Sequence, residues 1–359
     1  MDAVDCALVE YTNDLITLIE YQQYPIDQEI HSELKSVNKT STIETVMRLD
    51  VILGKLFANA ALDIIRKCRL DPEQIAAIGC HGQTILHRTG RPDATSLQIG
   101  DPNLINEMTG IPTVADFRRM DIAAGGEGAP LAPVFHALVL RSQTEDRVIL
   151  NIGGMANITI LPADHALSVT GFDTGPGNVL MDEWANQHLQ QAMDKDGNWA
   201  ASGKIDNNFL NILLEDNYFK QPPPKSTGRD YFNLGWLTGK IKDYGQTLSP
   251  EDIQASLTGL TTQTVADAIR NHARHTQTII VCGGGAHNSF LIKSLQKRLP
   301  DCKITTSRDY GFDPDAIEAM TFALLAQRRL ENLPGNIPAV TGADRECVLG
   351  AVYCSRKTG

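Results

Sequence analysis

Glycine-rich turns that follow apolar segments are the first feature of this sequence that could do chemistry. They lie at residues 153–154, 175–177 and 283–285. Such a turn lets backbone N–H groups approach an anion closely, and a following helix adds the positive end of its dipole. None matches the Walker A pattern or the Gly-x-Gly-x-x-Gly fingerprint, and any one alone could be a tight structural turn. Three in one chain favour a nucleotide cleft between two α/β units.

Polar side chains at the ends of expected strands are the candidates for proton transfer and ligand binding. Asp116 precedes Arg118 and Arg119, so it could be a general base beside an anion-binding pair, or simply the ion-pair partner of either arginine. His81 could bond a sugar hydroxyl or be structural. Asp173 could position Mg²⁺ or a water molecule, or cap the following helix.

Two further polar features have ordinary explanations. Glu318 begins an expected helix, where a carboxylate is favourable because of the helix dipole alone. The loop at residues 225–229 is cationic, and solvated surface is its simplest interpretation.

Alternating strands and helices must position these residues, which indicates an α/β architecture. Apolar runs predict strands over residues 6–11, 76–80, 96–100, 111–115, 168–172 and 278–282, and a β-hairpin over 148–161. Helical periodicity predicts helices over residues 27–36, 42–70, 254–275, 288–299 and 317–330, and another from Val179. Residues 221–228 must form a loop.

Composition limits the class of protein. The chain has 359 residues, 42% of them hydrophobic, and a formal net charge of −11. That balance argues against binding to nucleic acid or to an anionic membrane surface. The seven cysteines form no C-x-x-C pair, and the start of the chain has no basic and apolar leader. We therefore expect a cytoplasmic protein without disulfides, signal peptide or membrane span.

Short motifs occur in a fixed order over essentially the whole chain. They are 81–84 (HGQT), 97–101 (LQIGD), 116–119 (DFRR), 125–131 (GGEGAPL), 151–157 (NIGGMAN), 173–178 (DTGPGN), 224–229 (PKSTGR), 281–285 (VCGGG) and 341–343 (TGA). Together they resemble the anhydro-N-acetylmuramic acid kinase family.

The resemblance implies the actin-like ATPase (ribonuclease H-like) fold, with two α/β domains around a nucleotide cleft. We expect one domain over residues 1–130 and the other over 131–359, its last segment packing back on the first. The implied reaction uses ATP and Mg²⁺. Water opens the 1,6-anhydro ring of 1,6-anhydro-N-acetylmuramic acid and O6 is phosphorylated, which gives N-acetylmuramic acid 6-phosphate and ADP in cell-wall sugar recycling. A homodimer is also implied.

The resemblance further assigns roles to individual residues. Asp116 would be the general base, and His81, Gln83, Arg118 and Arg119 would bind the sugar. The metal ligands stay unassigned. The residues expected to contact ATP are Asp2, Asp5, Gly153, Gly154, Asn157, Asp173, Gly175, Gly177, Asn178, Gly283, Gly284, Gly285 and Glu318.

One departure from the family pattern concerns the start of the chain. Family members begin with a strand and a Gly-Thr-Ser-x-Asp-Gly-x-Asp turn, whereas the comparison predicts that this sequence starts inside that turn, with Ala3 where the pattern has Gly. We expect the strand at residues 6–9 to lack a partner as a result. We consider two explanations: the sequence starts at an internal Met of a longer protein, or the chain is a truncated, weakly catalytic sugar- or nucleotide-binding protein. A third hypothesis is an actin-like sugar kinase with another acceptor.

Overall fold

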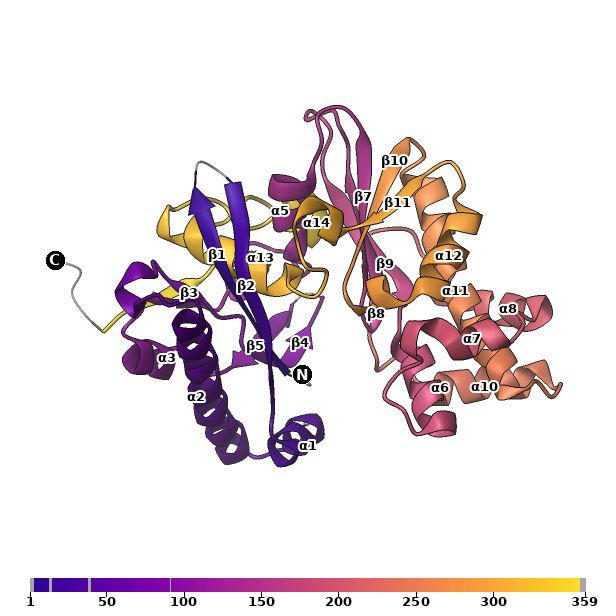
Figure 1. The fold of residues 1–359 in the computed structure, drawn as a ribbon, viewed down its shortest axis with the longest axis horizontal. Helices are drawn as coiled ribbons and strands as arrows, with labels where there is room; N and C mark the ends of the chain where they lie inside the picture. The colour runs from indigo at the N-terminus through magenta and orange to yellow at the C-terminus, as the bar shows by residue number, and fades with distance from the viewer. Residues whose placement is uncertain (1–2, 13–14, 38–39, 91, 356–359) are drawn as a thin grey trace. The chain divides into compact units, whose positions relative to one another are not determined.

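The chain folds into two compact units, each with its own sheets and core (Figure 1). The computed structural model describes residues 3–12, 15–37, 40–90 and 92–355. The first unit comprises Met1–Val139 and Ala316–Gly359, and the second comprises Leu140–Asp315. We expected the division at residues 130 and 131, whereas residues 131–139 belong to the first unit together with the final segment.

The second unit is built on a five-stranded mixed sheet. Its strands are β7 (Asp146–Ile152), β8 (Met155–Leu161), β9 (Thr170–Pro176), β10 (Thr276–Cys282) and β11 (Lys303–Thr306), in the order β11-β10-β7-β8-β9. β8 runs antiparallel to both of its neighbours, while the β7–β10 and β10–β11 pairs are parallel. Numbered within the unit, this is the order 3-2-1-4-5 with strand 2 reversed, which is the arrangement of ribonuclease H-like domains.

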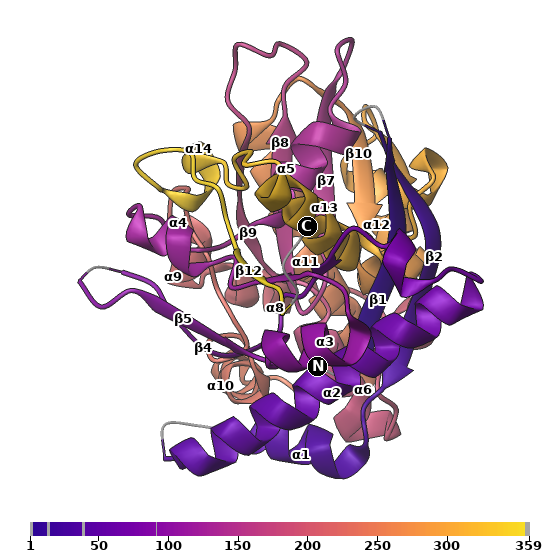
Figure 2. The ribbon, with the colours of Figure 1, turned by 90° about the vertical axis from the view of Figure 1, so that its left-hand side faces the viewer.

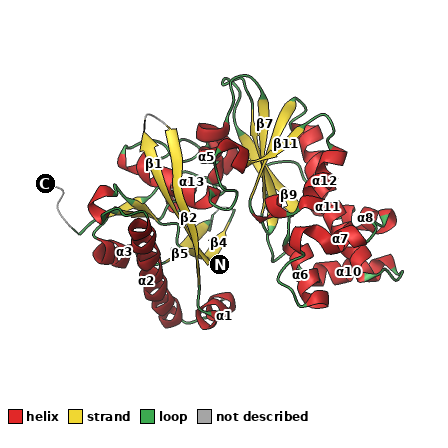
Figure 3. Cartoon of the chain, viewed as in Figure 1, coloured by secondary structure: helices red, strands yellow, loops and turns green. Residues whose placement is uncertain are grey.

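Helices of the second unit gather on one side of this sheet (Figure 3). The longest is α11 (Pro250–His272), which begins at Ser249, whose side chain accepts from the Asp252 N–H. Most of α11 is buried, and its threonine hydroxyls are hydrogen-bonded; Thr258 donates to Gln254 O within the helix, while Thr261 donates to Pro176 O. The others are α6 (Val179–Leu189), α7 (Asn198–Ser202), α8 (Asn207–Leu214), α9 (Asn217–Lys220), α10 (Leu234–Tyr244) and α12 (Ser289–Arg298).

The first unit carries its strands in three separate pieces (Figure 2). These are the antiparallel pair β1 (Ala3–Thr12) and β2 (Leu15–Pro25), the sheet of β3 (Ile78–Gly79), β6 (Thr113–Ala115) and β12 (Ala351–Tyr353), and the hairpin of β4 (Gln83–Arg88) and β5 (Thr95–Ile99). We expected residues 6–9 to lack a neighbouring strand. This was wrong for one edge of the strand, because β2, at residues 15–25, pairs with it and places Gln22 opposite Cys6.

Helices of the first unit pack against these pieces. α2 (Ile43–Lys67) begins at Thr42, whose side chain accepts from the Thr45 N–H, and it buries Leu49 and Leu53. α13 (Ile317–Leu330) matches the predicted range and packs against both β1 and β3. The remaining helices are α1 (Gln28–Ser36), α3 (Pro102–Thr109), α4 (Arg119–Ala123), α5 (Ala132–Phe135) and α14 (Pro338–Thr341). Within the described residues, no helix combines the length and apolar character that crossing a bilayer requires.

The predicted elements are present, but one boundary matters for function. We expected a strand that ends at Phe172 and a turn from Asp173, whereas β9 continues to Pro176. The ladder explains the difference, because Asp173 pairs with Asn157 and Gly175 pairs with Ala156 of β8. The carboxyl group of Asp173 therefore projects from a strand held in a sheet.

A buried carboxylate joins the glycine-rich loop after α4 to the C-terminal segment. Asp121 has no exposed surface. Its Oδ1 accepts from Asn336 Nδ2 and Thr341 Oγ1, both at 2.7 Å, and its Oδ2 accepts from Gly128 N at 2.8 Å. Gly126 is required here, because a Cβ at that position would lie 2.2 Å from Asp121 Oδ2. The three donors together compensate for the burial of the charge.

We expect Asp121→Ala to lower the free energy of unfolding by about 2–5 kcal/mol, because Asn336, Thr341 and Gly128 would each keep a buried donor without an acceptor. Urea unfolding measures the change. Glu331→Ala, at an exposed position, should stay within about 0.5 kcal/mol of the parent. Equal stabilities for the two variants would show that the Asp121 network does not hold the unit together.

Candidate active site

The predicted glycine turns of the second unit converge at the carboxyl end of β7. A Cβ on Gly177 would lie 2.3 Å from Gly153 O, and one on Gly283 would lie 2.4 Å from Asn151 Oδ1. Gly283 also has a φ of +75°, which favours glycine. A Cβ on Gly285 would lie 2.4 Å from Ile152 Cγ2. Backbone segments far apart in the sequence can approach this closely only because they carry no side chains.

The start of α6 is tied to the β7–β8 turn by its backbone amides. The N–H groups of Gly177 and Val179 donate to Gly154 O at 2.9 and 3.2 Å, and Asn178 N donates to Gly153 O at 2.8 Å. Asn178 Nδ2 also donates to Ile152 O at 3.4 Å. We expected Gly177 and Asn178 to contact ATP. Their backbone amides are used within the turn itself, whose shape they fix.

Gly284 differs from its two neighbours. The nearest atom to a Cβ at this position would be Asn178 Nδ2 at 3.8 Å, an ordinary contact distance. Gly283 and Gly285 are enclosed, whereas Gly284 has open space on its α-carbon face. Of the three, Gly284 is the one whose α-carbon has no close neighbour in the position of a Cβ.

A cation that sequence reasoning assigned to exposed surface lies beside this turn. A Cβ on Gly154 would lie 3.2 Å from Arg229 Nε and 3.4 Å from its Nη2. Burial raises the pKa of Asp182 to about 7, Arg229 opposes this rise, and Asp194 and Glu183 add to it. In the sequence, only a family motif drew attention to Arg229, because its contact with Gly154 links distant parts of the chain.

Asp173 is the predicted site carboxylate that lies in this unit, and its pKa is shifted. Burial raises the pKa of its carboxyl to about 6, and the hydrogen bond from Thr227 N to Oδ2, at 3.0 Å, lowers it. No partner of Oδ1 is found among the described residues. A carboxyl group that is ionised near neutral pH, with one oxygen fixed and the other available, meets the demands on a general base. Asn157 faces Asp173 across the β8–β9 ladder.

In the first unit, Asp116 follows β6 directly and has a φ of +59°. Asp tolerates this left-handed conformation better than most residues. Arg119 Nε donates to Asp116 Oδ1 at 2.7 Å, and Arg119 Nη2 donates to Oδ2. The ion pair that we held open as the alternative interpretation is therefore present. Its arginine side chain is 64% exposed, and its carboxylate 23%.

Two of the other predicted sugar-binding residues of the first unit, His81 and Arg118, are in contact. Arg118 Nε donates to His81 Nε2 at 2.9 Å, and Arg118 Nη1 donates to Gly128 O at 2.8 Å. The His81 ring stacks on Phe322 with its centroid 4.5 Å away. Burial and then the Arg118 charge lower the pKa of His81 to about 3, so its imidazole is neutral at physiological pH. The hydrogen-bond partners of the Arg118 guanidinium group, His81 and Gly128 O, are thus both neutral.

Glu318 lies near this cluster on α13. Burial raises the pKa of its carboxyl, the Arg118 charge lowers it, and Asp5 raises it slightly. Asp5 itself is on β1, where its Oδ1 accepts from Tyr21 OH and Gln23 Nε2. Gln83 opens β4, and its Nε2 donates to Thr84 O. Asp2, also predicted to contact ATP, lies outside the described residues.

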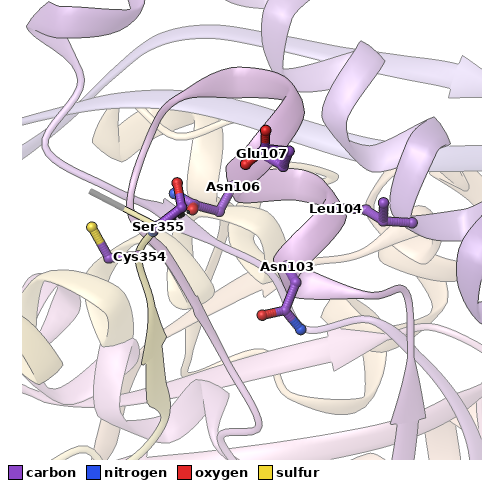
Figure 4. Close-up of a pocket in the computed structure, with 6 residues that line it drawn as sticks. All are labelled: Asn103, Leu104, Asn106, Glu107, Cys354 and Ser355. Atoms are coloured by element: carbon purple, nitrogen blue, oxygen red, sulfur yellow. Dashed lines mark hydrogen bonds between the residues drawn. The ribbon is translucent and has the colours of Figure 1, made fainter. Parts of the chain in front are cut away.

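A pocket of about 340 Å³ in the first unit contains none of the predicted site residues (Figure 4). Its walls are Asn103, Leu104, Asn106, Glu107, Cys354 and Ser355. Asn106 is already committed, because it accepts from Ser355 N and donates to Ile111 O. This pocket therefore offers no constellation for catalysis.

The fold and the site indicate the broad structural class of the protein. The ribonuclease H-like strand order of the second unit and the backbone-lined turn at its central strand are features of an actin-like ATPase, and both units are α/β. The fold class predicted from the sequence is confirmed.

The chain belongs to the anhydro-N-acetylmuramic acid kinase family, whose model matches residues 1–355. It is 46% identical over 359 residues to the anhydro-N-acetylmuramic acid kinase of Coxiella burnetii (99% of this chain, 95% of that protein). It is 46% identical to the same kinase of Saccharophagus degradans (98% and 95%) and 43% identical to that of Pasteurella multocida (99% and 95%). The family resemblance predicted from the motifs is confirmed.

Two solved structures are similar at a much lower level. Component A of (R)-2-hydroxyglutaryl-CoA dehydratase from Acidaminococcus fermentans is 13% identical, with a TM-score of 0.33 over 61% of this chain and 82% of that chain. The activator of 2-hydroxyisocaproyl-CoA dehydratase from Clostridium difficile with bound ADPNP is 12% identical, with a TM-score of 0.34 over 90% and 97%. Likeness at this level carries no argument about the site.

Replacement of the two adjacent glycines by alanine should give opposite results. We expect Gly285→Ala to lower Tm by several degrees, because its Cβ would overlap Ile152 and overpacking costs about 1–3 kcal/mol. Gly284→Ala should leave Tm unchanged, because its Cβ meets nothing closer than 3.8 Å. Differential scanning calorimetry measures both. A stable Gly285→Ala variant would contradict the close approach of residue 285 to β7.

Proposed function

We propose that the chain is an ATP-dependent kinase that opens the 1,6-anhydro ring of 1,6-anhydro-N-acetylmuramic acid with water and phosphorylates O6, which yields N-acetylmuramic acid 6-phosphate and ADP. Family membership supports the reaction, and the observation that carries it is the backbone-lined turn at the end of β7 with Arg229 beside it. Backbone without side chains, next to a guanidinium group, suits the approach of a polyphosphate.

The reaction needs a base, an anion-binding group and an aligned phosphoryl donor. The base takes a proton from water, whose oxygen forms a bond to C1 while the C1–O6 bond breaks. O6 then attacks the γ-phosphorus, and ADP leaves. Positioning and charge neutralisation provide most of the catalysis in phosphoryl transfer.

Two carboxylates are candidates for this base, and their surroundings separate them. Asp173 has one oxygen held by Thr227 N and a pKa of about 6, so it is ionised at neutral pH and remains able to accept a proton. Asp116, which the family resemblance suggested, has both oxygens occupied by Arg119. We propose Asp173 as the base. Asp116 is the second candidate and would require its ion pair to open.

The first-unit cluster is the proposed sugar-binding group. The hydrogen-bond partners of Arg118 are neutral, and the carboxyl group of Glu318 lies close enough to feel its charge. A guanidinium group that makes no ion pair of its own suits the lactyl carboxylate of the sugar. Neutral His81 orients Arg118, and Gln83 offers an amide to hydroxyl or acetamido groups. Arg119 is mostly exposed and supplies a second cation.

The remaining proposals concern the residues around ATP, the metal ion and the state of the protein in the cell. Gly153, Gly154, Gly175, Gly177, Asn178 and Gly283–Gly285 are the proposed surroundings of ATP, with Asn157, Glu318, Asp5 and Asp2 as further candidates. No group of three or more His, Cys, Asp or Glu residues in the described part of the chain could hold a metal ion. Mg²⁺ fits this arrangement as an ion carried mainly by the ATP phosphates, where it neutralises charge. We also propose a cytoplasmic homodimer, and the seven free cysteines support a reducing compartment.

The reaction itself is the first test. Purified chain with ATP, Mg²⁺ and the anhydro sugar should release ADP and a sugar 6-phosphate in equal amounts, and H₂¹⁸O should place one labelled oxygen at C1, as measured by mass spectrometry. Ordinary hexoses should release no ADP. Phosphorylation of a hexose without label would favour a kinase with another acceptor. Sugar binding by calorimetry without turnover would favour the weakly catalytic alternative.

The two candidate bases can be separated by isosteric amides. Asp173→Asn should lower kcat about 10²- to 10⁴-fold, because the amide cannot accept the proton, while ADP binding stays within a few-fold. In the parent, kcat should fall as pH decreases through about 6, since protonation of Asp173 removes the base. Asp116→Asn should retain more activity than Asp173→Asn. The reverse order of activities would return the role to Asp116.

A further inference from the structure

A short loop segment pairs with the edge of the second unit's sheet directly at Asp173. β9 is the last strand in the sheet order, so β8 occupies only one of its edges. On the other edge, Asp173 N donates to Lys225 O and Thr227 N donates to Asp173 Oδ2, both at 3.0 Å. The segment 225–227 thus replaces a neighbouring strand, with one of its two bonds made to a side chain.

Tyr218 links both sides of this contact. Tyr218 OH donates to Asp173 O at 2.7 Å, and Lys225 Nζ donates to Tyr218 O at 3.2 Å. The Lys225 ammonium group also lies 4.7 Å from the centre of the Tyr218 ring. Tyr218 is only 4% exposed and packs edge-on against Phe232. Tyr218 and Lys225 therefore contact each other and both contact the backbone of Asp173, which is more than forty positions away in the sequence.

We propose that Lys225 and Tyr218 are positioning residues. They hold segment 225–227 on β9 so that the Thr227 N–H fixes the Asp173 carboxyl group through Oδ2 and leaves Oδ1 to accept the proton of the attacking water. This inference rests on the proposed function with Asp173 as the base. It gives a role to the cationic loop that sequence reasoning placed on solvated surface.

The groups around Asp173 define what loss of this contact would do. The chargeable groups nearest to it are Tyr218 from α9, whose hydroxyl bonds the Asp173 carbonyl, and Lys225 from the loop, whose backbone carbonyl accepts from Asp173 N while its ammonium group contacts Tyr218. β8 contributes Asn157 and α11 packs on β9 through Thr261, both uncharged, with His272 of α11 against Phe172. The amide of Thr227 stabilises the charged carboxylate. Without that amide the pKa of Asp173 should rise, and the base should become protonated at a higher pH.

Lys225→Met tests the proposal, because it keeps the apolar stem but removes the ammonium group. We expect kcat to fall about 10- to 100-fold through misplacement of the base, with the KM for ATP little changed. The acidic limb of the kcat–pH profile should move up by about half a unit or more. Lys225→Arg, which keeps a cation and a donor, should recover most of the activity. Lys220→Met, at an exposed position of the same region, is the matched control and should behave as the parent.

Several outcomes would overturn the proposal. One is a folded Lys225→Met protein with the parent's kcat and pH profile; another is lost activity with an unmoved acidic limb, which would indicate a purely structural role. If Lys225→Met does not fold, Tyr218→Phe decides by the same two measurements, since it removes only the hydroxyl bond to Asp173. Failure of the proposed function is distinguishable, because the parent itself would then form no sugar phosphate, or Asp173→Asn would remain active.

Discussion

Close backbone packing at the carboxyl end of β7 is the constraint on which the second unit's site depends. Gly177 is pressed against Gly153 O, and Gly283 and Gly285 are pressed against Asn151 and Ile152. At each position even a methyl group would need the backbone to move, because its nearest neighbours lie well inside contact distance. The resulting surface is formed by peptide groups, and peptide groups can approach an anion closely without competing side chains.

Carboxylates show how surroundings decide the role of a residue type. Asp121 is fully buried and accepts from three neutral donors, which suits a structural role in holding two segments of the first unit together. Asp116 is committed to a guanidinium group, and the largely buried carboxyl group of Asp173 has a single amide donor. Only the last arrangement combines a charge that is costly to bury with an oxygen that has no partner among the described residues. That combination keeps proton affinity near neutral pH, which is what base catalysis requires.

Much of the fold could be predicted from the sequence, because helices, strands and turns leave patterns within short stretches of residues. The hairpin at 148–161 and the helix at 317–330 were predicted closely, and the three glycine turns were recognised. The continuation of β9 through Asp173 was missed, since a Gly-Pro-Gly run normally indicates a turn and only pairing with β8 keeps it extended. Arg229 and Tyr218 were missed as well. Their contacts with Gly154 and Asp173 join residues more than forty positions apart, and no local pattern contains that information.

The strand pairs of the first unit can be matched to strand pairs of the five-stranded sheet in the second unit. In the first unit, the antiparallel pair β1–β2 and the parallel pair β3–β6 correspond to β8–β9 and β10–β11 of the second. A counterpart of β7, the central strand that joins the two pairs, is not found among the first unit's described strands. α13 instead packs against both β1 and β3 and so connects the two pieces. The backbone-lined turn that follows β7 consequently has no equivalent in the described part of the first unit, whose contribution to the proposed chemistry is the side-chain cluster of Arg118 and His81.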